Sequence, residues 1–269
     1  MKFFGRSIAL NQVPQKIATI VNVVIAVYKW CNNPLSVLKA YFTRKGIDCI
    51  KLKNGYKIFL SSSKHDISTF IVIFCKKEYG IWNDKKTVVD VGANIGIFSM
   101  YAFCCGAEKV YGFEPNKESF ATIQKNIEAN NLGDRWIVSN AGIGAVSGSV
   151  IYIPKKSSPG NVARKDAGNN QQMFDAMPTI SLEDYIAEHK LDKIDLLKVD
   201  CEGGEYEMLP SLSSESAASI KSIMLEFHGS ETPIRDWFKQ NNFSITRYWP
   251  SPDEKNLGYL WAANNVSAV

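Results

Sequence analysis

The stretch VVDVGANIG, residues 88–96, decides the fold of this chain. Its first residues are apolar around one acid, which is typical of a strand buried on both faces of a sheet, and two glycines follow within one turn. In an open parallel sheet, ligands bind beyond the carboxyl ends of the strands, where the strand order reverses. We therefore expect a ligand at Gly92 to Gly96, because glycine lets a ligand approach the backbone and the next helix directs free N–H groups at it.

The chain after Thr87 continues this alternation of strands and helices. Strand-like apolar runs occupy residues 87–91, 109–114, 135–141, 194–200 and 222–227. Helical segments long enough to serve as crossovers lie between them, at residues 95–106, 118–130 and 181–190. The last of these begins with Ser181 and Asp184 in a capping-box arrangement. The alternation predicts an α/β fold, with a three-layer, doubly wound, Rossmann-like sheet that is mostly parallel.

Both ends of the chain differ from this pattern. We expect residues 1–80 to form a helical and hairpin cap ahead of a domain at residues 81–269. Residues 232–242 predict a helix with Thr232 as its N-cap. An antiparallel C-terminal hairpin is then predicted from two further apolar runs, 243–249 and 257–263.

Two elements are predicted within the cap. Residues 49–60 form two short alternating runs around the pair Asn54–Gly55, which is typical of a β-hairpin because both residue types tolerate positive φ. Residues 64–80 predict a helix with Asp66 as its N-cap and Gly80 as its end.

The segment from Ile17 to Trp30 is strongly apolar and follows three basic residues, Lys2, Arg6 and Lys16. Its length of about 14 residues is below the roughly 20 that a membrane span requires. The end of the segment also lacks the small residues of a signal-peptide cleavage site. We expect a helix that packs on its own domain, on a partner subunit or on a membrane surface, and these alternatives stay open.

The composition is that of a folded globular protein, since 45% of the residues are hydrophobic and 22% are charged. The net charge is +4 and the Lys and Arg residues are spread along the chain, so nucleic acid is not an expected partner. The six cysteines form no Cys-x-x-Cys pair and have no His at metal-binding spacing. This cysteine usage predicts free thiols and a cytoplasmic location. Peripheral binding to a membrane is an alternative that comes from the apolar segment and not from the cysteines.

The glycine turn disfavours two common ligands. A dinucleotide fingerprint has a second glycine where this chain has Asn94, and a phosphate-binding loop has a lysine that does not follow Gly96 here. S-adenosylmethionine fits better because it carries no phosphate, and Asp90 and Asn94 suit its amino-acid end. Glu114 ends the next strand about 20 residues on, where a carboxylate accepts from ribose hydroxyls. Asn140, at the end of the third strand, is predicted to contact the adenine.

Four stretches together resemble the FkbM-type methyltransferase family: VVDVGANIGIFSM (88–100), VYGFEPN (110–116), SNAGIG (139–144) and LKVDCEGGEYEML (197–209). The resemblance covers roughly residues 46–229, and its specific part is the set Lys198, Asp200, Glu202, Gly203 and Glu205. It implies S-adenosylmethionine as the methyl donor and O-methylation of a hydroxyl. We expect the acceptor to be a sugar or a related metabolite, with N- and carboxyl-methylation left open.

An alcohol acceptor has to lose a proton, and acids at two predicted strand ends are candidates for the base. We predict Asp200 and Glu202, after the fourth strand, and His228, after the fifth, as catalytic residues. A divalent cation such as Mg²⁺ or Ca²⁺ bound by Asp200, Glu202 and Glu226 is an alternative. Lys198 is expected to pair with one of these carboxylates.

The polar segment 154–178 shows no clear period, and we predict a loop on the acceptor side of the site. Its cations indicate either an anionic acceptor or ordinary loop solvation: Lys155, Lys156, Arg164 and Lys165. Two other functions stay open. One is an NAD(P)-dependent oxidoreductase on a similar sheet, which the missing glycine disfavours, and the other is a non-catalytic module that binds a membrane or a partner.

Overall fold

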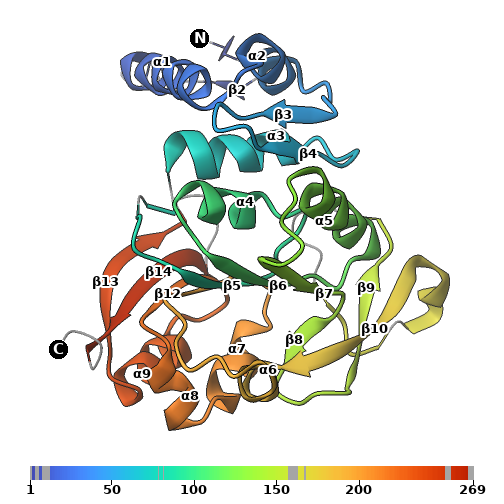
Figure 1. Ribbon diagram of the computed structural model, residues 1–269, viewed down its shortest axis with the longest axis vertical. Helices are drawn as coiled ribbons and strands as arrows, with labels where there is room; N and C mark the ends of the chain where they lie inside the picture. Colours follow the sequence, from blue (N-terminus) through green and yellow to red (C-terminus); the bar gives the residue numbers. More distant parts are fainter. Residues whose placement is uncertain are drawn as a thin grey trace. The chain divides into compact units, whose positions relative to one another are not determined.

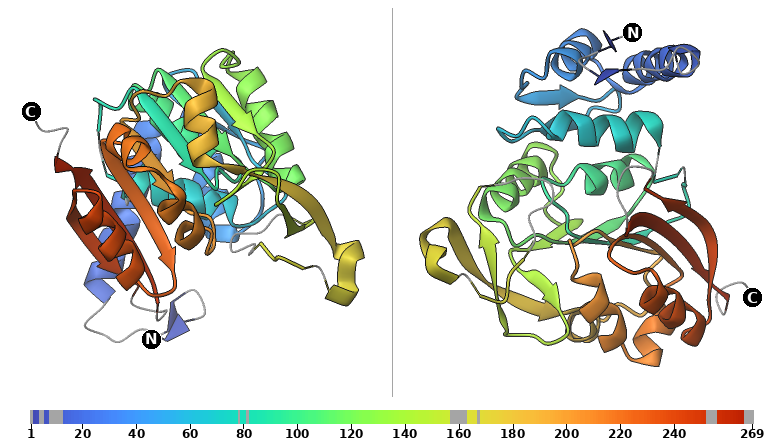
Figure 2. Two further views of the ribbon diagram at one scale, coloured as in Figure 1. Left: turned by 90° about the horizontal axis from the view of Figure 1, so that it is seen from below. Right: turned by 180° about the vertical axis from the view of Figure 1, so that it is seen from behind.

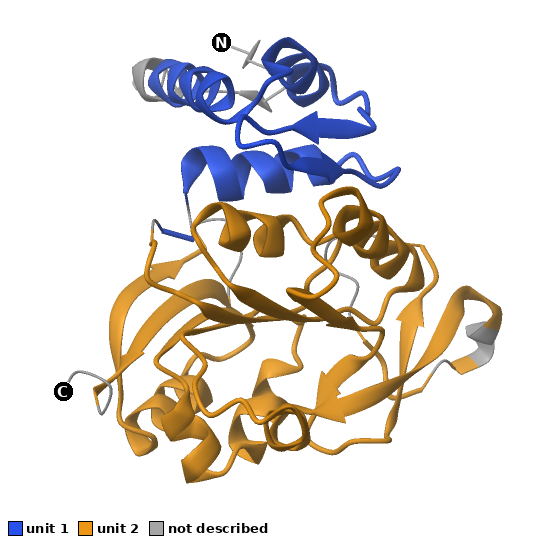
Figure 3. Ribbon diagram, in the orientation of Figure 1, with its two compact units in different colours: residues 1–80 blue, residues 81–269 orange. Residues whose placement is uncertain are grey.

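The computed structural model describes residues 2–3, 6–7, 13–77, 79–80, 82–156, 163–166, 168–251 and 256–265. The protein divides into two compact units, residues 1–80 and residues 81–269, which Figure 3 colours separately. Because unit 2 holds all the predicted strand ends, the candidate site belongs to that unit.

Unit 1 consists of helices and short strands. They are β1 Lys2–Phe3, β2 Arg6–Ser7, α1 Val13–Trp30, α2 Pro34–Thr43, β3 Cys49–Lys51, β4 Lys57–Phe59, α3 Asp66–Phe70 and the π-helical segment η2 Ile71–Lys76. Helix α1 packs on η2, where Val27, Phe70 and Phe74 are fully buried. Trp30 meets Phe74 edge-on, with 5.2 Å between the ring centroids. Strands β3 and β4 pair antiparallel, so the predicted hairpin is present.

Two details of the helix predicted at residues 64–80 are wrong. Asp66 is the first helical residue rather than the N-cap, because its Oδ2 accepts from the backbone N and the Oγ of Ser61, both at 2.7 Å. The helix ends at Lys76 rather than at Gly80, since Lys77 adopts the left-handed conformation with a φ of 58°. The hydrogen bonds of Asp66 and the backbone angle of Lys77 therefore make both ends of this helix differ from the predicted ones.

No helix in the described ranges of the chain has the length and apolar character needed to cross a membrane.

Unit 2 is built on a seven-stranded sheet in the order β13-β14-β12-β11-β5-β6-β7 (Figure 1). The strands in that order are Phe243–Pro250, Leu257–Asn264, Ser222–His228, Leu196–Val199, Thr87–Val91, Lys109–Phe113 and Trp136–Ser139. The five from β12 to β7 run parallel, and β14 and β13 are antiparallel additions. All five predicted strands and the C-terminal hairpin are confirmed.

Helices cover both faces of this sheet, which confirms the three layers. Figures 1 and 2 show α4 Ile97–Cys104 and α5 Lys117–Ala129 on one face. The other face carries α6 Leu182–His189, α7 Glu205–Met208, α8 Ser214–Ser219 and α9 Thr232–Gln240. The central strands are apolar because they have no solvent face, and every residue of β11 is buried.

The strand order reverses between β5 and β11. From β5 the chain adds β6 and β7 on one side, and it then returns to place β11 on the other side of β5. The ends of β5 and β11 are therefore neighbours, with Asp90 paired to Lys198 in the register. In doubly wound sheets, such a reversal is where ligands bind.

The segment 154–178, predicted to be a loop, is partly a strand pair. β9 Val150–Pro154 pairs antiparallel with β10 Phe174–Ser181, which also pairs with β8 Gly142–Gly144. Figure 1 shows β9 and β10 as an arm that carries the 3₁₀ segment η3 Gly168–Met173. The prediction failed because the part of β10 that lies in this segment, FDAMP (174–178), has no continuous apolar run and mixes exposed, half-buried and buried positions.

Helix caps were predicted with mixed success. Ser181 is the N-cap of α6, and its Oγ accepts from the backbone N of Asp184 at 3.4 Å. Thr232, by contrast, is the first residue of α9 and Glu231 occupies the N-cap position.

Asp195 accepts hydrogen bonds from the backbone at the start of β5, and these contacts provide a test of the fold. Its Oδ2 accepts from the backbone N of Lys86 and Thr87, both at 3.0 Å, and its Oδ1 lies 3.1 Å from Lys221 Nζ. Burial tends to raise the pKa of Asp195, but these donors outweigh burial and hold the pKa below its ordinary value.

We expect Asp195→Asn to lower the free energy of unfolding by about 1–3 kcal/mol at neutral pH, measured by urea denaturation. Because the folded-state pKa is depressed, this stabilisation is present above about pH 4 and is lost as the pH falls through the folded pKa. The exposed Asp192→Asn is the matched control. Equal losses for the two variants would contradict the assignment.

Candidate functional site

The candidate site lies where the parallel strands of unit 2 end at one edge of the sheet. Four groups of residues meet this edge, and each follows a different strand. They are the turn Gly92–Gly96 after β5, Glu114 after β6, the segment Asp200–Glu205 after β11 and His228 at the end of β12. Parallel pairing forces the carboxyl ends of these strands together, although the residues are far apart in the sequence.

The glycine turn packs closely against other residues of unit 2. Gly92 has a φ of 75°, and a Cβ added there would lie 1.7 Å from the carbonyl oxygen of Asp200. Gly96 has a φ of 84°, and its added Cβ would lie 2.5 Å from the ring of Trp136. The sequence argument assigned these glycines to ligand approach. The structure shows that the contact between the ends of β5 and β11 already requires glycine at position 92.

Glu114 is held by the turn it faces. Its Oε2 accepts from the backbone N of Asn94 and its Oε1 from the backbone N of Asn116, both at 2.8 Å. The side-chain amide of Asn140 donates to the backbone carbonyl of Glu114 at 2.8 Å. Burial raises the pKa of Glu114 to about 7, against the lowering effect of the two N–H donors. Three predicted cofactor residues, Asn94, Glu114 and Asn140, are thus one hydrogen-bonded group.

Asp90 is placed deeper than expected. It is fully buried, its Oδ1 lies 3.1 Å from Lys198 Nζ, and its Oδ2 accepts from Ser99 Oγ at 2.6 Å. Lys198 Nζ also donates to the carbonyl of Gly92 at 2.7 Å and lies 3.8 Å from Asp200. Burial alone would lower the pKa of Lys198, but the carboxylates of Asp90 and Asp200 outweigh it and raise the pKa. The predicted pairing of Lys198 with an acid is therefore present in the structure.

The second half of the site is a histidine surrounded by carboxylates. Glu205 is fully buried, its Oε1 accepts from the backbone N of His228 at 2.9 Å, and its Oε2 accepts from the backbone N of Gly203 at 2.9 Å. The imidazole Nδ1 lies 3.4 Å from Glu205 Oε1. Its Nε2 lies 3.4 Å from Glu202 and 3.9 Å from Glu226. His228 thus has an acid facing each ring nitrogen.

These contacts set the charge of the cluster. Burial lowers the pKa of His228, but the neighbouring carboxylates raise it to about 9. Burial also raises the pKa of Glu205, yet His228 and the backbone donors hold it below its ordinary value. Burial and the charge of Asp200 raise the pKa of Glu226 to about 8. At neutral pH, His228 is an imidazolium, Glu205 is a carboxylate and Glu226 carries a proton.

The charge of His228 limits its predicted role as a base. An imidazolium has no lone pair to accept the proton of an acceptor hydroxyl, so it acts as a hydrogen-bond donor at neutral pH. Asp200 and Glu202 retain side-chain exposures of 29% and 25%, whereas Glu205 has none. Of the acids around the histidine, these two are the most exposed, since Glu226 retains only 14%.

The arrangement also bears on the metal alternative. Asp200, Glu226 and His228 each offer one ligand atom, and these atoms lie within 4.8 Å of one another. The sequence had grouped Asp200 with Glu202 and Glu226, but Glu202 faces the histidine instead. Metal binding by this cluster stays a prediction.

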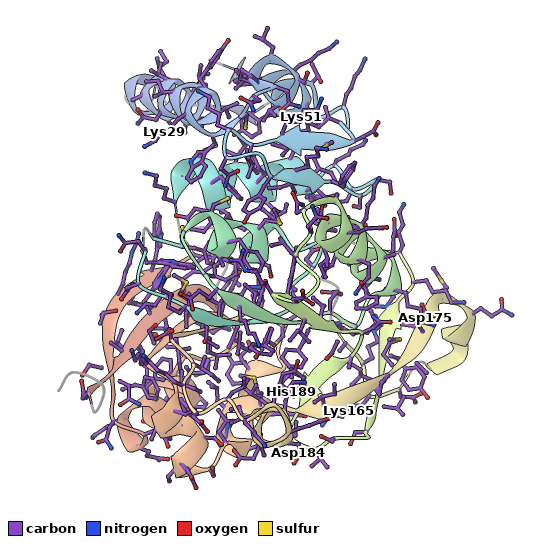
Figure 4. All side chains as sticks on the ribbon, in the orientation of Figure 1. Lys29, Lys51, Lys165, Asp175, Asp184 and His189 are labelled. Atoms are coloured by element: carbon purple, nitrogen blue, oxygen red, sulfur yellow. The ribbon has the colours of Figure 1, made fainter. Side chains whose placement is uncertain are left out.

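Two cations predicted to attract an acceptor have local contacts. Lys165, labelled in Figure 4, lies with its Nζ 2.6 Å from Glu207 of α7. The guanidinium of Arg164 lies 5.0 Å from the centre of the Phe174 ring. Both residues precede η3 in the arm, so part of this segment contacts the helix that holds Glu205.

Sequence reasoning missed the role of Glu205 as the partner of His228. The residue stood in the motif at 198–205, but no spacing rule connects it with a histidine 23 positions later. A carboxylate at the start of a short helix after a buried strand was the only available signal.

Comparisons with known proteins show what this chain is similar to. The family model described as "Methyltransferase FkbM domain" matches residues 90–245. Methyltransferase 1 of Beauveria bassiana is 26% identical over 238 residues, which cover 78% of this chain and 95% of that protein. The 31-O-demethyl-FK506 methyltransferase FkbM of Streptomyces tacrolimicus is 26% identical, covering 68% and 82%. The hexuronic acid methyltransferase AglP of Haloferax volcanii is 24% identical, covering 54% and 56%.

Among solved structures, Mycoplasma capricolum TrmK in complex with S-adenosyl-homocysteine matches with a TM-score of 0.42 and 12% identity. The match covers 68% of this chain and 63% of that one.

The contact between Glu205 and His228 gives a direct test. We expect Glu205→Gln to lower the pKa of His228 by about one unit or more, because a negative charge beside the imidazolium is removed. NMR titration of the His228 ring protons measures this shift, with the exposed Glu207→Gln as the control on the same helix.

The sign of the linked stability follows from the raised pKa. His228 contributes stability that is fully present below pH 6.5, its ordinary pKa, and is lost as the pH rises through about 9. A His228 pKa that is unchanged in Glu205→Gln would show that the charge comes from other groups.

Proposed function

The chain belongs to the methyltransferase FkbM domain family, and from this premise we propose that it transfers a methyl group from S-adenosylmethionine to a hydroxyl oxygen. The acceptor class we propose is a sugar or a related metabolite. The observation that carries the proposal is the position of the acid–histidine cluster beside the glycine turn and Glu114 at one edge of the sheet.

The donor side of the site fits a nucleoside that has no phosphate. Each oxygen of Glu114 accepts one backbone N–H and keeps a further lone pair, so the carboxylate can also accept from ribose hydroxyls. Gly92, Asn94 and Gly96 form the adjoining turn, and we assign the contact with the adenine to Asn140, whose side-chain amide donates to the carbonyl of Glu114. S-adenosylmethionine, when bound, would supply the methyl group: the acceptor oxygen would attack the methyl carbon in line with the C–S bond, and S-adenosylhomocysteine would leave with the electrons of that bond.

Asp90 supports this side from within the unit. Its contact with Lys198, and that of Lys198 with the carbonyl of Gly92, hold the turn in a single position. Most of the rate enhancement in a displacement of this kind comes from fixed alignment of the reacting atoms, so a rigid turn serves the reaction directly.

The acceptor side needs a group that takes a proton. We assign this role to Asp200 or Glu202, because both carboxylates remain partly accessible at the site. His228 holds Glu202 through the 3.4 Å contact of its Nε2, and Glu205 in turn holds His228. In this arrangement the hydroxyl proton passes to a carboxylate, and the imidazolium fixes the position of that carboxylate.

The names of two relatives support the acceptor class. One is a hexuronic acid methyltransferase, and another methylates an oxygen of demethyl-FK506. The first name states a sugar acid as the substrate, and the second states methylation at an oxygen.

The donor assignment is tested by calorimetry with S-adenosylhomocysteine. We expect the wild-type protein to bind it at one site, and Glu114→Gln to bind about tenfold or more weakly because the acceptor for the ribose is weakened. The exposed Glu128→Gln on α5 is the matched control. If NAD raises the melting temperature of the wild-type protein and S-adenosylhomocysteine does not, the proposal is overturned, independently of the results with the variants.

The reaction itself is tested by mass spectrometry. Host extract incubated with the enzyme and isotopically labelled S-adenosylmethionine should gain a product that carries a labelled methyl on oxygen. We expect Glu202→Gln to lower its formation by about 10²-fold or more, the contribution typical of a positioned base. Label on nitrogen, or on a carboxyl group as a methyl ester, would refute methylation of a hydroxyl while leaving the donor assignment intact.

A further inference from the structure

Helix α1 of unit 1 carries apolar residues on a face that is exposed in the described part of the chain. Ile17, Val21, Ile25 and Tyr28 follow one another at spacings of four, four and three residues and so share one stripe of the helix. They are 50%, 48%, 61% and 46% exposed. The residues of α1 that serve the core of unit 1 are others, Val23 and Val27, which are 2% and 0% exposed.

An outward stripe of this kind is unusual in a surface helix. Such helices normally present charged and polar residues to water and reserve the apolar stripe for the core. Contiguous exposed apolar side chains mark an interaction site in most soluble proteins. We call Ile17, Val21, Ile25 and Tyr28 the α1 stripe.

The charge of unit 1 is the second observation. Residues 1–80 contain 13 Lys and Arg against three Asp and Glu, a net charge of +10. Residues 81–269 contain 18 against 24, a net charge of −6. The overall value of +4 conceals this division, because the cations are denser in unit 1 while nearly all the acids lie in unit 2.

The cations of unit 1 are available at its surface. Those that are exposed in the described ranges include Lys29, Lys39, Arg44, Lys45, Lys51, Lys53 and Lys64. Figure 4 labels Lys29, in the last turn of α1, and Lys51, in β3. Of the acids, Asp66 is buried against Ser61. A charge of this size on about 80 residues creates an attractive potential for anionic surfaces.

We propose that unit 1 binds an anionic lipid bilayer, with the α1 stripe inserted among the head groups and the surrounding lysines and arginines in contact with lipid phosphates. The helix lies along the surface, since its other face is packed on η2. Apolar insertion and basic attraction are two signals that together give stable peripheral binding.

Two other binding partners each account for only one of the two features, the α1 stripe or the positive charge of unit 1. A second copy of the chain would cover the stripe but would bring two units of charge +10 together, which repel each other. A nucleic acid would neutralise the lysines but would leave four apolar side chains with no partner. An anionic bilayer satisfies both features.

Vesicle cosedimentation of the full-length protein tests the proposal. We expect binding to vesicles of phosphatidylcholine mixed with phosphatidylglycerol and little binding to phosphatidylcholine alone. High salt should weaken binding, because the screening length falls from about 10 Å at 0.1 M to about 3 Å at 1 M. The double variant Val21→Gln, Ile25→Gln should bind about tenfold more weakly, since two inserted apolar side chains are lost.

The control is Val146→Gln, which replaces a 64% exposed valine of unit 2 and should leave vesicle binding unchanged. All three substituted positions are exposed, and unchanged thermal melting confirms that the variants are folded. Equal vesicle binding by the wild type and the double variant would overturn the proposal. Tight binding of polyuridylate RNA by a wild-type protein that does not bind vesicles would also overturn it. A third contrary result is a wild-type dimer in light scattering that does not bind vesicles and that the double variant converts to a monomer.

Discussion

The site of this methyltransferase depends on the buried ion pair between Lys198 and Asp90. A lysine removed from water has to be paired and hydrogen-bonded, and Lys198 meets this requirement with Asp90 and the carbonyls of Val91 and Gly92. The pair joins β11 to β5 where the strand order reverses. Removing one partner would leave an uncompensated charge inside the sheet, which is far more costly than losing the attraction alone.

The same contact organises the two halves of the site. On one side, the carbonyl of Gly92 is fixed, and the turn it begins directs the backbone N–H of Asn94 at Glu114. On the other side of the site, Lys198 offsets part of the charge of Asp200. His228 is the cation that faces the other acids there, Glu202 among them. One buried cation, Lys198, and one half-buried cation, His228, thus offset the charge of a dense group of carboxylates.

Most of the fold could be predicted because its signals are local. Each central strand is a short apolar run, the cap by Ser181 depends on residues within one turn, and the reversal of the sheet follows from alternating strands and helices. The errors occurred where a contact outside the local pattern decided the outcome. Ser61 moved the start of α3 at Asp66, and pairing with β8 and β9 converted the expected loop into the strand β10.

For the candidate site, the chemical groups and the edge of the sheet at which they lie could be inferred from the order of the residues, because parallel strands place their carboxyl ends together. How those groups pair depends on contacts that form when the chain folds. It buried Asp90 against Lys198, 108 residues away in the chain, and it placed Glu205 beside His228. Burial and charge at such distances fix each pKa, and neither is encoded in the neighbouring residues. The charge state of His228 is therefore a property of the folded chain alone.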